Sequence, residues 1–273
     1  MKIALNADID FEGIGLSEKV SLIKNAGFDA AFYSWREKGN AALAGELLYK
    51  YGLELQSVHA PFSHIADFWD ANKCGRELEY QVECLEDCAE HGAKLVVSHV
   101  FIGFGEQHPN ETGVDTFKQY IAEAKKLGLA LAFENTEGEK YLDCLMQSIS
   151  DCDNAGFCWD SGHEQCYNRG RDMLAAYGDR LLCTHINDNL GVTGSEITFS
   201  DDSHLVPFDG IIDWRDAASR LKKTGFKGPL TVEMTTKNRP NRNTHYIYDG
   251  LSPAQYLDRV YAAALRIAEM INE

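Results

Sequence analysis

Nine acidic and histidine side chains stand at or just beyond the ends of short apolar runs in this sequence. In chain order they are His59, His99, Glu134, Asp160, His163, His185, Asp202, His204 and Glu233. One such residue alone is typically a hydrogen-bonded structural group, but a charged group directly after a buried run is unfavourable unless it is paired or metal-bound. The pattern recurs at six successive runs, and this recurrence indicates one shared metal site.

The elements that must position these residues alternate between apolar strands and amphipathic helices. Strands are expected at about residues 3–6, 29–35, 53–59, 94–101, 129–135, 157–160, 181–188 and 230–234. Helices are expected near residues 18–26, 41–51, 76–91, 114–127, 140–150, 171–177, 214–223 and 253–271, several of them ending at a glycine. Eight β-then-α units predict a parallel sheet closed into a (β/α)8 TIM barrel, a single α/β domain over residues 1–273. Reactive side chains of such barrels come from the C-terminal strand ends, which would gather the candidates at one mouth.

The composition excludes several classes of protein. A net charge of −16 opposes binding to phosphate backbones, so nucleic acid is not an expected partner. The sequence offers no signal peptide and no apolar run of membrane-spanning length, which predicts a cytoplasmic location and no membrane contact.

The eight cysteines form no Cys-x-x-Cys pair and are expected to be free thiols. Cys183, two residues before His185, should face inward one layer deeper and serve in packing.

The mixture of carboxylate and imidazole groups limits the metal. Such donors suit Mn²⁺ or Zn²⁺, and also Co²⁺ or Fe²⁺, whereas Mg²⁺ and Ca²⁺ prefer oxygen ligands alone. We therefore expect a transition-metal ion as the cofactor.

Four motifs carry a family resemblance that covers essentially the whole chain. They are Glu134-Asn, Trp159-Asp-Ser-Gly-His163, His185-Ile-Asn-Asp188 and Val232-Glu233. Together they resemble the xylose-isomerase-like TIM barrels, a superfamily of sugar isomerases, ketose epimerases, inosose dehydratases and AP endonucleases of the endonuclease-IV type.

The resemblance implies a site and a reaction. One divalent ion would be held by Glu134, Asp160, His185 and Glu233, with Glu134 and Glu233 also acting as the acid/base pair and His163 positioning the substrate. The implied function is metal-dependent isomerisation or epimerisation of a sugar or sugar derivative through a metal-stabilised enediolate.

Further side chains are candidates for binding a small-molecule sugar. These are His59, His99, Trp35 and Phe62, with Phe68, Trp69 and Phe104 as additional aromatic groups near the expected mouth, although each aromatic residue could equally belong to the core. Ketose 3-epimerases usually carry an arginine shortly after the histidine of strand seven, but here no Lys or Arg occurs between Arg180 and Arg215. The loop after strand eight holds Lys237, Arg239 and Arg242, which suit either an anionic sugar or a solvated loop.

Two alternatives share the same residues. The endonuclease-IV type matches this chain at all nine candidate positions, which implies a trinuclear zinc phosphodiesterase with a second metal cluster of His59, His99, His163, Asp202 and His204. The net charge and the absence of Lys and Arg from segments 62–70 and 103–110 favour a sugar substrate instead. An inosose-type dehydratase is the other alternative, and the sequence leaves the choice of sugar and a homo-oligomeric state open.

Overall fold

The strands of the computed structural model, which describes residues 1–273, are all parallel and follow one another in chain order around the sheet. Their bounds are β1 Ile3–Asn6, β2 Ala30–Ser34, β3 Glu54–His59, β4 Leu95–Ser98, β5 Ala130–Glu134, β6 Ala155–Asp160, β7 Leu181–His185 and β8 Leu230–Val232. The ladder runs from β7 through β6, β5, β4, β3, β2 and β1 to β8. This order is that of a TIM barrel, and it confirms the predicted fold class.

The barrel closes at a thin seam between β7 and β8. One parallel bridge joins Ile186 to Val232. Ile186 N donates to the carbonyl of Thr231 at 2.8 Å, and Glu233 N donates to the carbonyl of Ile186 at 3.1 Å. The Thr184 hydroxyl accepts from Thr231 N at 3.0 Å, in place of a backbone carbonyl. The seam therefore lies beside two of the candidate metal ligands, His185 and Glu233.

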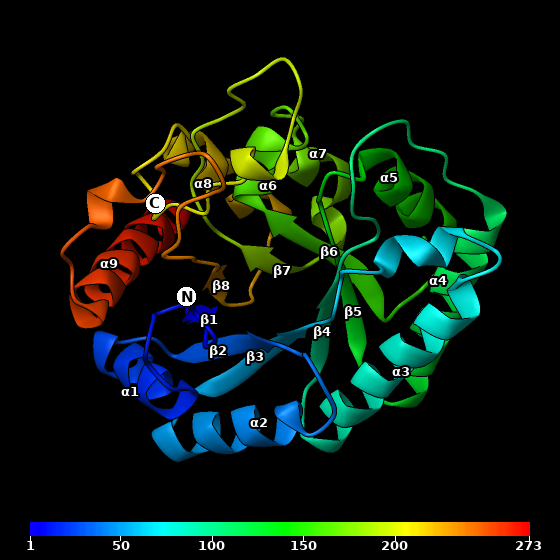
Figure 1. Cartoon of the computed structure of the whole chain (residues 1–273), viewed down its shortest axis with the longest axis horizontal. Helices are drawn as coiled ribbons and strands as arrows, with labels where there is room; N and C mark the ends of the chain where they lie inside the picture. Colours follow the sequence, from blue (N-terminus) through cyan, green and yellow to red (C-terminus); the bar gives the residue numbers. More distant parts are fainter.

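Helices surround the strands as an outer ring (Figure 1). Their bounds are α1 Leu16–Ala26, α2 Asn40–Tyr51, α3 Cys74–Glu90, α4 Glu111–Lys126, α5 Glu139–Ser148, α6 Ser161–Cys166, α7 Met173–Tyr177, α8 Trp214–Thr224 and α9 Pro253–Asn272. Short 3-10 turns lie at Ile65–Trp69, Gly178–Arg180, Phe199–Asp201 and Tyr246–Tyr248. None of the helices combines the length and the apolar character needed to cross a membrane.

The helix boundaries follow local signals. Gly27 ends α1 with φ +108°, in the left-handed region that glycine adopts without strain. A Cβ at Gly27 would lie 2.9 Å from the ring of Tyr261, so a side chain is excluded by space as well as by backbone. The main departure from expectation is α6, a helix of six residues directly after β6 that was not predicted. Asp160 caps this helix by accepting from His163 N at 2.6 Å.

Alternation along the strands separates two interiors. Phe133 packs outward into the large core between the strands and the helices, whereas Ala132 belongs to a small cluster inside the barrel. Glu134, two residues after Ala132, shares the inward face. The same alternation applies to β4, β6 and β7, and it directs the strand-end side chains to the barrel mouth.

Candidate functional site

Glu134 lies fully buried at the end of β5 and is the centre of the site. Its Oε2 atom is 3.3 Å from His59 Nε2 and 3.4 Å from His99 Nε2. Its Oε1 atom is 3.1 Å from His185 Nδ1. The ends of β3, β4, β5 and β7 thus converge on one carboxylate.

The predicted metal quartet, Glu134, Asp160, His185 and Glu233, comes together at the barrel mouth. One ligand atom from each residue lies within 4.8 Å of the others. His185 Nδ1 is 3.1 Å from Glu134 Oε1 and 3.3 Å from Glu233 Oε2. Donors bound tetrahedrally at 2.0–2.1 Å lie roughly 3.3 Å apart, so these spacings suit atoms that share one ion.

The electrostatics of the quartet also suit a cation. Burial, reinforced by the charges of Glu134 and Glu233, raises the pKa of Asp160 to about 6. Burial acts against ionised Glu134, but the charge of His185 and its hydrogen bonds to the histidines hold the pKa of Glu134 well below its usual range. Two buried carboxylates and the half-buried Glu233 repel one another, and a divalent ion would relieve this repulsion. The donor set therefore fits a transition-metal ion.

Two further groups flank the quartet. His59 and His99 meet Glu134 on one side, and this trio also lies within 4.8 Å. On the other side Asp202 Oδ2 is 3.0 Å from His204 Nε2 and 3.5 Å from His163 Nε2. All nine candidates from the sequence thus lie in one constellation.

His204, one of the two histidines in the group around Asp202, occupies a strained backbone position. His204 has φ +50°, a conformation that residues other than glycine rarely adopt. Such strain is often found at functional sites. Here it accompanies a ring whose Nε2 atom contacts Asp202 and whose Nδ1 atom lies 3.2 Å from the carbonyl of Glu233.

Two asparagine side chains that were not among the predicted site residues support Asp160. Asn187 Nδ2 donates to Asp160 Oδ2 at 2.8 Å. Asn135 accepts from Asp160 N at 2.8 Å and donates to its carbonyl at 2.9 Å. Both stand within the motifs Glu134-Asn and His185-Ile-Asn-Asp188, and their position beside the candidate ligands was the available signal.

Asp188 organises the long segment that carries Asp202 and His204. Its fully buried carboxylate accepts four hydrogen bonds. The donors are Asn189 N at 2.8 Å, Ile212 N at 3.1 Å, Phe208 N at 2.9 Å and Trp214 Nε1 at 2.8 Å. Backbone hydrogen bonds with Leu205 tie the same residue to the middle of the segment.

A cavity of about 390 Å³ opens onto these groups. Its lining includes the predicted residues Phe62 and Arg239 together with Ser34, Ile102, Glu137, Tyr167 and Phe199. Phe62 stacks on His99 with ring centroids 4.6 Å apart and remains 40% exposed, as befits a residue at the rim. The volume is in the range of small-molecule pockets.

The expectation that Trp35 faces the mouth was wrong. Trp35 is buried, and its Nε1 atom donates to Asp87 of α3 at 2.8 Å. Phe32 stacks on His185 and Ser34 lines the cavity, so Trp35, the residue directly after β2, points outward by simple alternation. Phe68 and Trp69 likewise pack against Phe117 of α4, and Phe104 lies over Tyr167 and Phe199 outside the cavity lining.

The basic loop after β8 is tied to the site. Arg239 lines the cavity, and its Nη2 atom donates to Asp202 Oδ2 at 3.0 Å. Arg242 forms an ion pair with Asp201 at 3.0 Å, whereas Lys237 is exposed. Of the three cations, Arg239 alone reaches the cavity.

Comparisons with known proteins agree with this architecture. Residues 20–252 match the family described as xylose isomerase-like TIM barrel. An uncharacterized protein, y4fM of Sinorhizobium fredii, is 28% identical over 94% of this chain and 90% of its own length. D-psicose 3-epimerase of Clostridium cellulolyticum H10 superposes with a TM-score of 0.76 at 13% identity, over 99% of both chains. The IolI protein, whose crystal structure binds a zinc atom, gives a TM-score of 0.74 at 19% identity over 98% of both chains.

Proposed function

The chain belongs to the xylose isomerase-like TIM barrel family, and we propose that it is a divalent-metal-dependent isomerase or epimerase of a sugar or sugar derivative. The observation that carries the proposal is the convergence of Glu134, Asp160, His185 and Glu233 within 4.8 Å beside a cavity of small-molecule size. The fold shared with D-psicose 3-epimerase supports the same class of reaction.

The proposed chemistry rests on the two glutamates. A divalent ion bound at the quartet would supply Lewis acidity that polarises the substrate carbonyl. Glu134 and Glu233 come from β5 and β8, so they can approach the carbon beside that carbonyl from different directions. One carboxylate would take the proton from that carbon to give an enediolate, and the other would return a proton to it.

The side chains around the cavity would bind and orient the sugar. His59, His99 and His163 offer ring nitrogens for hydroxyl groups, and Phe62 offers an apolar face at the rim. Trp35 is not part of this proposal because it lies outside the barrel interior. Arg239 provides one cationic group for an acidic or phosphorylated substrate.

The test is solvent exchange with a panel of free and phosphorylated sugars in D₂O, followed by NMR with Mn²⁺-loaded protein. We expect deuterium at the carbon next to the carbonyl. Glu134→Gln and Glu233→Gln should each lower turnover by roughly 10²–10⁴-fold, as expected for loss of a positioned acid or base. Glu111→Gln, an exposed glutamate on α4, is the matched control and should turn over normally. Conversion without solvent deuterium would refute the two-base mechanism, and a product that has lost water would identify a dehydratase.

A second candidate function is favoured by the two flanking groups. His59 and His99 with Glu134, and His163 with Asp202 and His204, could hold two more ions, as in a trinuclear zinc phosphodiesterase. The net charge of −16 and the small cavity argue against a duplex substrate. Metal analysis separates the two: about one tightly bound ion per chain fits the sugar enzyme. Three ions with incision of abasic duplex, lost in His59→Ala, would establish the phosphodiesterase.

A further inference from the structure

A layer of small side chains forms the floor of the site inside the barrel. Val97, Ala132, Cys158 and Cys183 make a separate buried cluster. Each stands two residues before a member of the site, namely His99, Glu134, Asp160 and His185. Because residues two apart on a strand share one face, this layer lies directly beneath the site.

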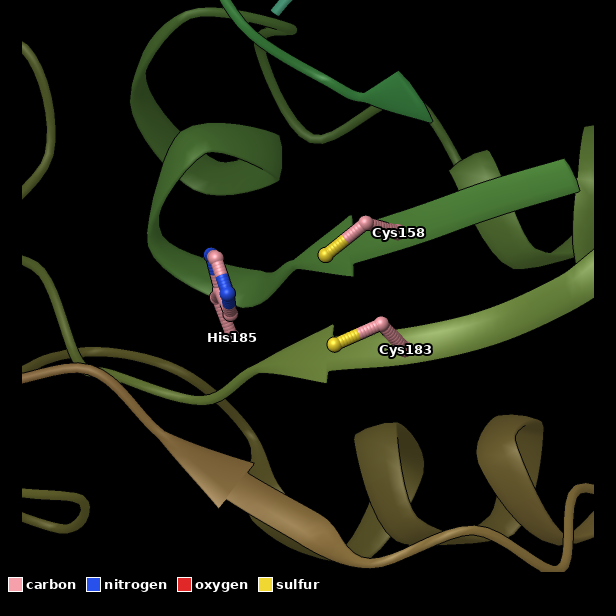
Figure 2. Close-up of side chains that lie close together, drawn as sticks. All are labelled: Cys158, Cys183 and His185. Atoms are coloured by element: carbon pink, nitrogen blue, oxygen red, sulfur yellow. The ribbon is translucent and has the colours of Figure 1, made fainter. Parts of the chain in front are cut away.

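Two thiols in this floor adjoin an imidazole. Cys158 on β6 and Cys183 on β7 are register partners in neighbouring parallel strands. Figure 2 shows both sulfurs directed toward the side on which the His185 ring lies. The two sulfurs and one His185 ring nitrogen all lie within 4.8 Å of one another, and all three residues are fully buried.

One ring nitrogen of this cluster lacks a partner in the protein. His185 Nε2 is buried without a hydrogen-bond partner. The amide Nε2 of Gln56 donates to the Cys183 sulfur at 3.2 Å. A layer that served only apolar packing would not place a buried ring nitrogen without a hydrogen-bond partner, or an amide that donates to a sulfur, beside these thiols.

Two sulfurs and an imidazole are the donor set that zinc and other soft cations prefer. With Zn–S distances of about 2.3 Å, two sulfurs on one tetrahedral ion lie roughly 3.8 Å apart, which is compatible with the 4.8 Å limit within which these ligand atoms lie. We propose that Cys158, Cys183 and His185 bind a thiophilic divalent cation, Zn²⁺ or Cd²⁺, at the floor of the barrel mouth. On binding, each thiol would release its proton to solvent and the sulfur would donate an electron pair to the ion, as would the unprotonated ring nitrogen of His185. When the quartet is occupied as well, the His185 ring would also release its remaining N–H proton to solvent and bridge the two ions as an imidazolate.

This site is chemically distinct from the quartet above it, although both use His185. The quartet is rich in oxygen donors and should take Mn²⁺, whereas the floor is rich in sulfur and should not. The inference does not depend on the proposed sugar chemistry, since it follows from the three side chains alone.

X-ray absorption at the zinc edge tests the proposal on the full-length protein saturated with Zn²⁺. We expect sulfur neighbours at about 2.3 Å in addition to nitrogen and oxygen neighbours at about 2.0–2.2 Å. Cys158→Ser/Cys183→Ser should remove the sulfur neighbours, and either single substitution should halve them. Cys84→Ser/Cys88→Ser is the matched control, because these buried sulfurs on α3 are 3.9 Å apart but form no cluster with a histidine.

Three outcomes would overturn the proposed sulfur site. Absence of sulfur around zinc in the wild-type protein overturns the proposal without any variant having to fold. Sulfur that persists in Cys158→Ser/Cys183→Ser, or that disappears in Cys84→Ser/Cys88→Ser, also overturns it. A negative result leaves the proposed function standing, because deuterium exchange with Mn²⁺-loaded protein tests that function independently.

Discussion

Replacing Asp188 by Asn should destabilise the protein strongly although the two side chains have nearly the same shape. The carboxylate accepts from four donors, two on each oxygen, and each pair comprises one buried and one half-buried N–H group. In the Asp188→Asn variant one oxygen is replaced by an amide nitrogen that is itself a donor, so two N–H groups lose their acceptor and face another donor. Each buried unsatisfied group costs about 1–3 kcal/mol, which gives a loss of about 4 kcal/mol for the pair.

Thermal unfolding followed by circular dichroism provides the measurement. For a chain of this size, about 4 kcal/mol corresponds to a fall in Tm of roughly 8 °C. Asp258→Asn, an exposed aspartate on α9, removes the same charge without buried hydrogen bonds and should leave Tm unchanged. If Asp188→Asn melted within about 2 °C of the wild type, water or a rearranged segment would be satisfying these donors, and the organising role assigned to Asp188 would be refuted.

Three further outcomes are expected. Chelation with EDTA should lower the free energy of unfolding, and Mn²⁺ at 100 times its Kd should restore about 2.7 kcal/mol of it in calorimetry. A Glu134→Ala/Glu233→Ala variant that is stabilised by the same amount would contradict the assignment of the quartet as the metal site. Trp35→Phe should cost about 1–2 kcal/mol in urea unfolding through loss of its bond to Asp87, with kcat/KM unchanged; a raised KM would return Trp35 to the binding site. Gly27→Ala should destabilise by more than Gly39→Ala, because both have positive φ but only Gly27 has a ring within 2.9 Å of the added methyl group; equal losses in the same assay would show that the backbone alone decides.

Much of the architecture could be predicted because the sequence repeats one pattern. Each apolar run had to be a strand buried on both faces, and the eight βα units left the closed barrel as the expected arrangement. Strand ends were less certain: β4 and β7 leave the ladder three residues earlier than expected, since an apolar run does not show where pairing stops. The α6 helix was missed because its six residues are too short for a helical period and include a glycine.

The site residues also differ in how well the sequence predicts them. Residues at strand ends could be found from the chain alone, because a strand end fixes both the location and the direction of a side chain. Tyr167, Phe199 and Glu137 could not, since they reach the cavity from loops and short helices whose course depends on tertiary packing. Trp35 could have been placed correctly from the period of two along β2, which assigns Ser34 to the interior and its neighbour to the helix side.

The short pairing between β7 and β8 gives the metal quartet a second role, which is to hold these two strands together. Elsewhere in the barrel, adjacent strands are joined by ladders of two to five register pairs, but here a single bridge spans the gap. His185 stands on one side of that gap and Glu233 on the other, with 3.3 Å between their ligand atoms. An ion held by both residues would cross-link β7 to β8, the neighbouring strands that share the fewest register pairs. Binding of the ion should therefore slow hydrogen exchange at the amides of Ile186 and Glu233. The effect should be smaller at the amides between β2 and β3, because five register pairs already hold those strands together.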